Sequence, residues 1–404
     1  MREPRERTLI KSARLVKKYD VSRGDLLIAE GKIARIEEEG ELKAEAEREI
    51  NADGAYLSPG FIDLHVHGGG GGEFNEAPKE AAGEEEISRI LNAHLMRGTT
   101  TLLGTVLTGS LEEMRAAMDL IAARDHPQLG GIYLEGPFFS AEKKGAQPPD
   151  HLREPDLETF KRLVEGFEEE IKIFSLAPEL PGALELLPAI REIGATPAIG
   201  HSNATFAETV QALNEGAELF THVFNGMKGF HHREPGVLGA ALSAGGVGPD
   251  VPVELIADGV HVSPEAIQLL LELKGADKVC LITDAMAATG MGEGEYSLGG
   301  QKVVVKEGQA RLAQDGSLAS SVLTMDVALK NMVQFGLSLP QAARSASLVP
   351  ARVLGVEDRK GSIERGKDAD LVLFDESFQV EKVLIGGESF SPPPPGSHSL
   401  EVEM

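Results

Sequence analysis

Residues 61–67 of the chain read Phe-Ile-Asp-Leu-His-Val-His, an apolar run that ends in two histidines separated by one valine. Seven further short apolar runs follow, and most are separated by stretches of roughly ten or more residues with helical character. This alternation is typical of repeated β-α units that build a parallel sheet. The eight predicted strands span residues 61–67, 99–105, 131–135, 171–176, 196–201, 218–222, 252–256 and 278–284.

The number of strands predicts an α/β fold of the (β/α)8 type, the TIM barrel. Eight strands in about 290 residues match the size of such a barrel with loop insertions. A doubly wound parallel sheet is the alternative, because it gives the same alternation of strands and helices. Residues 8–57 and 361–386 instead alternate short β-like runs with turns. Each end alone has too few strands to bury a face, so we expect the two ends to pair with each other.

These patterns divide the chain into three parts. We expect a small β domain made of residues 1–57 with 355–388, and the (β/α)8 barrel at 58–354. Residues 389–404 contain four consecutive prolines between polar flanks, so a disordered tail is predicted there.

Composition excludes several classes of protein. The 404 residues hold 39 Lys and Arg against 64 Asp and Glu, a net charge of −25 that repels nucleic acid. The single cysteine, Cys280, cannot form an internal disulfide or a Cys-rich zinc site. No apolar run approaches the roughly 18 residues that cross a bilayer, and the N-terminal residues lack the apolar core of a secretory signal. We expect a cytoplasmic protein with no nucleic-acid or membrane partner.

Ionisable side chains gather where the predicted strands end. A barrel carries its active site at the carboxyl ends of its strands. Strand geometry sends residues i and i+2 to the same face, so the two histidines of the first run point into the barrel together. The alternative is a set of separately buried ionisable groups, each with its own desolvation cost. His, Glu and Asp at one rim favour a divalent transition metal. The candidate residues are His65, His67, Glu135, His201, His222 and Asp284, with His261 a few residues after the seventh run.

Asp284 follows the last predicted strand in the sequence LITDAM. Alone, such an aspartate is often the N-cap of the next helix. Beside a metal it could take the proton of a water molecule that attacks a carbonyl. No G-x-S-x-G motif occurs, and Cys280 lies inside a strand, so a serine or cysteine nucleophile has little support. The sequence therefore favours hydrolysis without a covalent intermediate.

The loop after His222 concentrates positive charge in an acidic protein. It contains Lys228, His231, His232 and Arg233. Such a cluster could be plain surface, but near a metal a guanidinium is suited to hold a phosphate or carboxylate through paired hydrogen bonds. A small anionic substrate is therefore plausible. The glycines at 68–72 do not fit a dinucleotide motif, and we expect them to form a tight turn beside the metal.

The chain resembles the amidohydrolase superfamily through PGFIDLHVHG (59–68) and GSIERGKDADLVLFD (361–375), which bracket the barrel. Between them YLEGPF, KKGAQ, GHSNA, THVFNGM, IADGVH, ITDAM and GSLASSVLTM have the order and spacing of the N-acetylglucosamine-6-phosphate deacetylase family. The resemblance covers residues 8 to about 388 and implies a distorted barrel, a small β-sandwich built from both chain ends, and a homodimer.

The resemblance also implies roles for individual residues. Glu135, His201 and His222 would hold a divalent metal (Zn, Fe, Mn or Co), and His65 with His67 would add a second metal bridged by Glu135. Asp284 would serve as both base and acid, and Arg233 would reach the substrate from the partner subunit. The implied substrate-binding residues are Ala146, Gln147, Asn225, Gly226, Arg233, Asp258, His261, Leu318, Ala319 and Ser320.

Two positions depart from the family pattern. Some members have a histidine where this chain has Gln147, whose amide N–H could donate to the acetyl carbonyl instead. Many members have glycine where this chain has Ser320, which adds a hydroxymethyl group to a loop that faces the substrate.

The implied activity is deacetylation of N-acetylglucosamine 6-phosphate to glucosamine 6-phosphate and acetate. Two alternatives remain open. The chain could hydrolyse another N-acyl amino sugar or a cyclic amide, or it could be an inactive homologue that only binds a sugar phosphate, because a fold alone does not establish activity.

Overall fold

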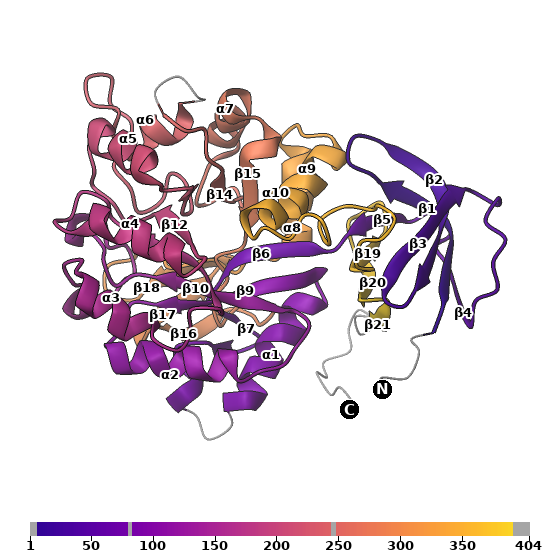
Figure 1. The fold of residues 1–404 in the computed structure, drawn as a ribbon, viewed down its shortest axis with the longest axis horizontal. Coiled ribbons are helices and arrows are strands. Elements are labelled where there is room, and N and C mark those ends of the chain that lie inside the picture. Colours follow the sequence, from indigo (N-terminus) through magenta and orange to yellow (C-terminus); the bar gives the residue numbers. More distant parts are fainter. Residues whose placement is uncertain (1–5, 80–82, 244–247, 391–404) are drawn as a thin grey trace.

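The computed structural model describes residues 6–79, 83–243 and 248–390. Its central sheet consists of eight parallel strands, each hydrogen-bonded to the strand that follows it in the chain (Figure 1). They correspond one to one with the eight predicted strands. The strands are β6 (Phe61–Val66), β9 (Thr99–Leu107), β10 (Leu129–Glu135), β11 (Ile171–Leu176), β12 (Thr196–Ile199), β13 (Leu219–Phe220), β14 (Val253–Ile256) and β15 (Val279–Ile282).

The sheet closes because its last strand lies beside its first. The amide of Asp284, just after β15, donates to the carbonyl of His65 on β6 at 2.9 Å. The amide and hydroxyl of Thr283 donate to the buried carboxylate of Asp63, at 3.1 and 2.6 Å. This closure excludes the doubly wound sheet and confirms the predicted barrel, with Asp63 joining the two strands at the seam.

Helices cover the outside of the barrel (Figure 1). In α2 the buried residues Met114, Ala117, Met118 and Ile121 recur every three or four positions, so one stripe of the helix packs on the barrel. Ser110 caps the start of α2 in a capping box with Glu113. The helices are α1 (Gly83–Leu95), α2 (Leu111–Ala122), α3 (Leu157–Val164), α4 (Ala183–Glu192), α5 (Phe206–Glu215), α6 (Gly236–Leu242), α7 (Pro264–Lys274), α8 (Met325–Gln334), α9 (Leu339–Ala346) and α10 (Leu348–Val353).

Strands from both ends of the chain form a second, mixed sheet beside the barrel (Figure 1). The two ends meet where β19 pairs antiparallel with β5, and Leu15, Leu57 and Leu371 lie in the core that this sheet buries. The expected pairing of the ends is therefore present. The strands are β1 (Thr8–Val16), β2 (Val21–Ala29), β3 (Lys32–Glu38), β4 (Arg48–Asn51), β5 (Tyr56–Pro59), β19 (Leu371–Phe374), β20 (Val380–Ile385) and β21 (Glu388–Phe390).

The last of these strands includes the first two residues of the predicted tail. Ser389 and Phe390 lie in β21, just beyond the limit of residue 388 that the sequence suggested for the small domain. The rest of the predicted tail, residues 391–404, lies outside the described residues.

Two small sheets lie beside the mouth of the barrel. The glycine stretch forms a hairpin of β7 (Gly68–Gly69) and β8 (Gly72–Glu73), in which Gly70 and Gly71 have φ of +58° and +86°. The expected tight turn is thus present, and it uses the left-handed backbone that glycine tolerates. A three-stranded sheet that we did not predict comprises β16 (Gly294–Leu298), β17 (Gln301–Lys306) and β18 (Gln309–Leu312). Short 3-10 helices are η1 (Ala77–Lys79), η2 (Ala141–Lys143), η3 (Pro149–His151) and η4 (Ala276–Lys278).

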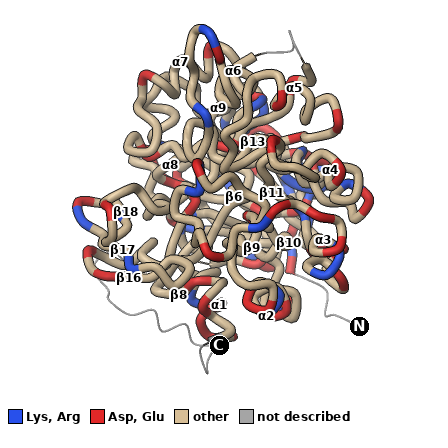
Figure 2. The backbone as a smooth tube through the Cα atoms, turned by 90° about the vertical axis from the view of Figure 1, so that its left-hand side faces the viewer, with Lys and Arg blue, Asp and Glu red and all other residues tan. Residues whose placement is uncertain are grey.

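Charged residues are distributed along the outer elements. Figure 2 shows acidic residues on α2, α3 and α4, with basic residues interspersed among them. Among the described residues, no helix combines the length and the apolar character that crossing a lipid bilayer requires.

Candidate active site

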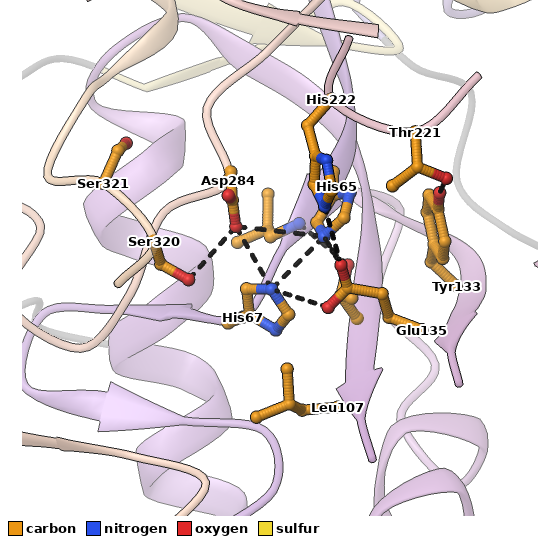
Figure 3. A network of polar contacts seen from close by, with 12 residues as sticks. His65, His67, Leu107, Tyr133, Glu135, Thr221, His222, Asp284, Ser320 and Ser321 are labelled. Atoms are coloured by element: carbon orange, nitrogen blue, oxygen red, sulfur yellow. Dashed lines mark hydrogen bonds and ion pairs between the residues drawn. The ribbon is translucent and has the colours of Figure 1, made fainter. Parts of the chain in front are cut away.

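Four histidines and two carboxylates meet at the carboxyl ends of the barrel strands. Figure 3 labels His65, His67, His222, Glu135 and Asp284 among them. His65 lies on β6, and Glu135 is the last residue of β10. His201, His222 and Asp284 each lie two residues after a strand, β12, β13 and β15 respectively. The predicted convergence of these residues is therefore observed. Because all six side chains are buried, their polar atoms must find partners within the protein or in a bound ion.

Glu135, His201 and His222 form the first of two ligand groups. Oε1 of Glu135 lies 3.1 Å from Nε2 of His201 and 3.0 Å from Nε2 of His222. The two imidazole nitrogens are themselves 3.2 Å apart. These three atoms surround one point, as the ligands of a single cation do.

His65, His67 and Asp284 form the second group. The Nε2 atoms of His65 and His67 are 3.2 Å apart, and Oδ1 of Asp284 lies 3.2 Å from Nε2 of His67. Glu135 also borders this group, because its Oε1 is 3.6 Å from Nε2 of His65 and its Oε2 is 3.5 Å from Nε2 of His67. The carboxylate of Glu135 therefore lies between the two groups, where a bridging ligand would lie.

Hydrogen bonds on the far side of three imidazoles direct Nε2 toward the cluster. Nδ1 of His201 lies 2.8 Å from the carbonyl of Lys143, and Nδ1 of His222 lies 3.2 Å from the carbonyl of Asn225. Since a carbonyl only accepts, each Nδ1 carries the hydrogen, and Nε2 presents its lone pair. Nδ1 of His65 faces a carboxylate oxygen of Glu254 at 3.3 Å. Lone pairs that approach each other this closely repel unless a cation lies between them, so the donor set fits a divalent metal.

The electrostatics of the cluster point the same way. Burial by itself would raise the pKa of Glu135, but the charge of His65 and the close approach of His201 and His222 hold it well below its usual value. Burial would lower the pKa of His65, but Glu135, Glu254 and Asp284 raise it well above its usual value. The site therefore stabilises positive charge among ionised carboxylates, and this is the environment that a cation needs.

Several residues of the site have strained backbone. His201, His222 and Asp284 have φ of +45°, +27° and +50°, in the left-handed region that side chains usually avoid. Such strain persists only where the surrounding structure fixes it, and it is concentrated at functional sites. In each case the chain leaves a barrel strand and turns sharply, which brings the side chain over the mouth of the barrel.

A pocket opens above the cluster. Its lining includes His67, Glu135, His201, His222 and Asp284, together with two leucines, Leu107 and Leu298. Seven of the predicted substrate-binding residues line it as well: Ala146, Gln147, Asn225, Gly226, His261, Leu318 and Ser320.

Three predicted substrate-binding residues do not line this pocket in the described chain. Asp258 instead accepts hydrogen bonds from the backbone and from Nδ1 of His261, the latter at 2.6 Å, so it orients that imidazole. The side chain of Ala319 packs in the core beneath the three-stranded sheet. Arg233 is exposed, and its guanidinium contacts the ring of His232 at 3.0 Å.

Gln147 holds a metal-ligand candidate in place. Its amide nitrogen donates to Oε2 of Glu135 at 2.8 Å, and its amide oxygen accepts from the backbone of Thr108 at 3.2 Å. Because the side chain is almost fully buried and held at both ends, one of its N–H groups is committed to Glu135 rather than to a substrate.

Sequence reasoning missed the polar residues beneath the cluster. The buried carboxylate of Glu254, on β14, accepts from the amide of His222 at 3.2 Å and lies 3.5 Å from the hydroxyl of Tyr133. Tyr133 and Ser175 each bond the hydroxyl of Thr221 at 2.8 Å. The only signal available was a glutamate inside the apolar run Val253–Ile256, which strand periodicity alone does not distinguish from a solvent-facing residue.

Comparison with known proteins places the chain in a family of hydrolases, and this agrees with the metal-ligand geometry described above. Residues 56–389 match the amidohydrolase family. The chain belongs to this family. This amidohydrolase is 38% identical over 394 residues to the N-acetylglucosamine-6-phosphate deacetylase of Bacillus subtilis, covering 95% of this chain and 96% of that relative. It is 37% identical over 370 residues to the N-acetylgalactosamine-6-phosphate deacetylase of Escherichia coli O157:H7, covering 90% and 93%.

A solved structure supports the fold of this amidohydrolase over nearly its whole length. An alanine variant of the N-acetyl-D-glucosamine-6-phosphate deacetylase of Mycobacterium smegmatis, in complex with N-acetyl-D-glucosamine-6-phosphate, matches with a TM-score of 0.87. The two chains are 34% identical, and the match covers 95% of this chain and 99% of the other.

Proposed function

We propose that the protein removes the acetyl group of N-acetylglucosamine 6-phosphate, giving glucosamine 6-phosphate and acetate. The observation that carries this proposal is the approach of two imidazole nitrogens, at 3.1 and 3.0 Å, to one oxygen of the buried Glu135, beside a second group of three ligands. Relatives with deacetylase activity toward amino-sugar phosphates supply the substrate class.

The metal ligands of this proposal are the two groups described above. Glu135, His201 and His222 would hold one divalent cation, and His65, His67 and Asp284 would hold a second, with Glu135 between them. The chemistry that a bound divalent cation supplies in such a site is to lower the pKa of water and to polarise the amide carbonyl. Imidazole and carboxylate ligands suit Zn, Fe, Mn and Co alike.

Asp284 serves as the general base and then as the general acid of the proposed reaction. Its carboxylate is ionised, because hydrogen bonding and charge from His65, His67 and His222 outweigh burial and lower its pKa. It takes a proton from the water that attacks the acetyl carbonyl and returns a proton to the amine nitrogen as the C–N bond breaks. Water and amide thereby become acetate and amine, and one side chain serves both steps.

The sugar would lie in the pocket above Asp284. His261 lines this pocket, and its Nδ1 is held by Asp258, so its other ring nitrogen remains to contact a sugar hydroxyl. Burial would raise the pKa of Asp258, but its hydrogen bond and charge interaction with His261 keep that pKa below its usual value, so the carboxylate stays ionised.

Arg233 of the partner subunit would bind the phosphate in a homodimer. Within its own chain Arg233 is exposed and does not line the pocket. In the same loop Phe230 is 61% exposed, which is unusual for a phenylalanine and is typical of a surface that another subunit covers. A guanidinium pairs with a phosphate through two parallel hydrogen bonds and so selects for it.

N-acetylgalactosamine 6-phosphate is a second candidate substrate, because a relative that deacetylates it is 37% identical to this chain. The two sugars differ in the orientation of one hydroxyl, which a pocket can discriminate by pairing or leaving unpaired a polar group.

An acetate-release assay tests the proposal. Metal-replete protein is given N-acetylglucosamine 6-phosphate, N-acetylgalactosamine 6-phosphate and unphosphorylated N-acetylglucosamine. We expect the highest kcat/KM for the first and a large loss when the phosphate is removed. Preference for the second sugar would reassign the substrate, and no acetate from any of the three would refute the proposal in favour of a protein that only binds the sugar phosphate.

A further inference from the structure

Ser320 contacts Asp284 rather than standing free in the pocket (Figure 3). Its hydroxyl donates to Oδ1 of Asp284 at 3.1 Å. The same oxygen lies 3.2 Å from Nε2 of His67 and 3.8 Å from Nε2 of His65. Ser320 thus adds a third contact to the one carboxylate oxygen that His65 and His67 also approach.

The backbone fixes where this hydroxyl lies. The amide of Ser321 donates to the carbonyl of Asp284 at 2.8 Å, and the amide of Met286 donates to the carbonyl of Ser321 at 3.0 Å. Ser321 therefore pairs with the segment after β15 in the manner of an added parallel strand. The residue before it, Ser320, is held directly beside the carboxylate.

This placement has a conformational cost. Ser320 has φ of +52°, a left-handed conformation that glycine adopts without strain and that side chains rarely adopt. Serine at this position strains the backbone, and in the described chain its side chain gains the contact with Asp284 and a place on the pocket wall. A strained residue that touches a reacting group is a reason to seek a role for that contact.

We propose that Ser320 is a positioning residue, whose hydroxyl fixes the orientation of the Asp284 carboxylate for proton transfer. This inference rests on the proposed function, in which Asp284 moves the proton. It differs from the role expected from sequence, in which Ser320 contacts the substrate. The two roles affect different kinetic constants, because loss of orientation lowers kcat, whereas loss of a substrate contact raises KM.

Two substitutions separate the hydroxyl from the backbone strain. Ser320→Ala removes the hydroxyl and keeps the strained φ, whereas Ser320→Gly removes both. We expect both variants to lose about 10- to 100-fold in kcat, the effect of one hydrogen bond to a charged group, with KM within about twofold of wild type. We also expect Ser320→Gly to have a higher Tm than Ser320→Ala, because glycine relieves the strain.

Glu307→Gly is the matched control. Glu307 is an exposed residue with φ of +51°, at the turn after β17, and it does not line the pocket. We expect this variant to raise Tm and to leave kcat and KM unchanged. It therefore reports the effect of strain relief alone.

Each outcome bears on the proposal. Wild-type kcat in Ser320→Ala, or a raised KM with unchanged kcat, would overturn it, and the latter would make Ser320 a substrate contact. A crystal structure of Ser320→Ala gives a readout that needs no activity: we expect the Asp284 carboxylate to rotate, and an unchanged carboxylate would contradict the proposal. If the wild type releases no acetate, the proposed function fails, whereas normal wild-type turnover with an unaffected Ser320→Ala refutes only this inference.

Discussion

At the scale of single residues, the histidines of the site are defined by what holds their outer nitrogens. The carbonyls of Lys143 and Asn225 accept from His201 and His222, so those rings present a lone pair to the cluster before any ion binds. His67 differs, because its Nδ1 is buried and has no hydrogen-bond partner among the described residues. Its ring is fixed by packing and by its neighbours at Nε2 alone.

Replacement of the proposed base gives the first prediction. Asp284→Asn keeps the shape of the side chain but cannot accept the proton, so we expect kcat to fall by about 10²- to 10⁴-fold. The measurement is acetate release at saturating substrate, together with elemental analysis. The variant should retain metal at Glu135, His201 and His222. Retained turnover would remove Asp284 from the mechanism.

The second metal is tested by a pair of alanine variants. His65→Ala removes one ligand of the His65, His67 and Asp284 group, so we expect metal content to fall from about two to about one per subunit. His201→Ala, the matched variant, should affect the other group. Elemental analysis after dialysis gives the ratio. If His65→Ala retains the full metal content of the wild type, His65 and His67 are structural.

At the scale of elements, one contact between helix and hairpin is sensitive to pH. His94, near the end of α1, donates from Nε2 to the carbonyl of Gly68 in β7 at 2.9 Å. Burial lowers the pKa of His94 to about 4, although the bond to Gly68 partly offsets this. Above pH 6.5 the ring is neutral in both the folded and the unfolded chain. Between pH 6.5 and 4 His94 binds a proton in the unfolded chain but stays largely neutral in the folded protein. The free energy of unfolding therefore falls as the pH is lowered.

His94→Gln removes this titration and keeps a donor for Gly68. Between pH 6 and pH 5 we expect wild-type protein to lose about 1 kcal/mol more of its free energy of unfolding than the variant does. Urea unfolding of both proteins in the presence of a chelator measures the difference. Equal losses in the two proteins would show that His94 does not titrate as inferred.

The elements differed in how well their sequence predicted them. The barrel strands were found because buried parallel strands are continuous apolar runs, and several of the predicted runs ended at a polar residue such as Glu135 or His201. The sheet of β16, β17 and β18 was missed, although Val303 and Val305 alternate with exposed residues in β17. The hydrogen bonds that close the barrel between β6 and β15 could not be predicted either. The bond from Thr283 to Asp63 joins residues that only the closed barrel brings together.

At the scale of the whole molecule, two subunits are proposed to complete each active site. Arg233→Ala should raise KM strongly for the phosphorylated sugar and barely change it for the neutral one, because only the phosphate pairs with the guanidinium. Steady-state kinetics with both substrates measure this. Equal effects on the two would refute phosphate binding by Arg233.

Mixing two impaired variants, assayed with the phosphorylated sugar well below the KM of Arg233→Ala, tests whether Arg233 acts across the interface. In a heterodimer of Arg233→Ala and Asp284→Asn, one site would have its own Asp284 and Arg233 of the partner subunit. Random exchange of subunits should therefore restore about a quarter of the wild-type sites. If Arg233 acts within its own chain, each site lacks one group and mixing restores nothing.

The site was predictable as a set of residues more than as an arrangement. The metal-ligand candidates could be predicted from the sequence because strand ends in a barrel share one rim, which places His65, Glu135 and Asp284 together. The role of Asp258 could not be predicted, because its hydrogen bond to His261 depends on a loop conformation that no sequence periodicity encodes. Glu254 was hidden for a similar reason, since only the fold shows that its carboxylate faces His65 in the barrel interior.

We propose that buried imidazoles and carboxylates hold a divalent cation, and that the protein cannot hydrolyse the amide without it. The most direct measurement is acetate release from N-acetylglucosamine 6-phosphate by chelator-treated protein, before and after metal is restored, with metal per subunit determined on the same samples. We predict that turnover is lost with the metal and returns with it, and that Glu135→Ala neither binds metal at this group nor regains turnover. Full turnover by protein shown to be free of metal would contradict the account.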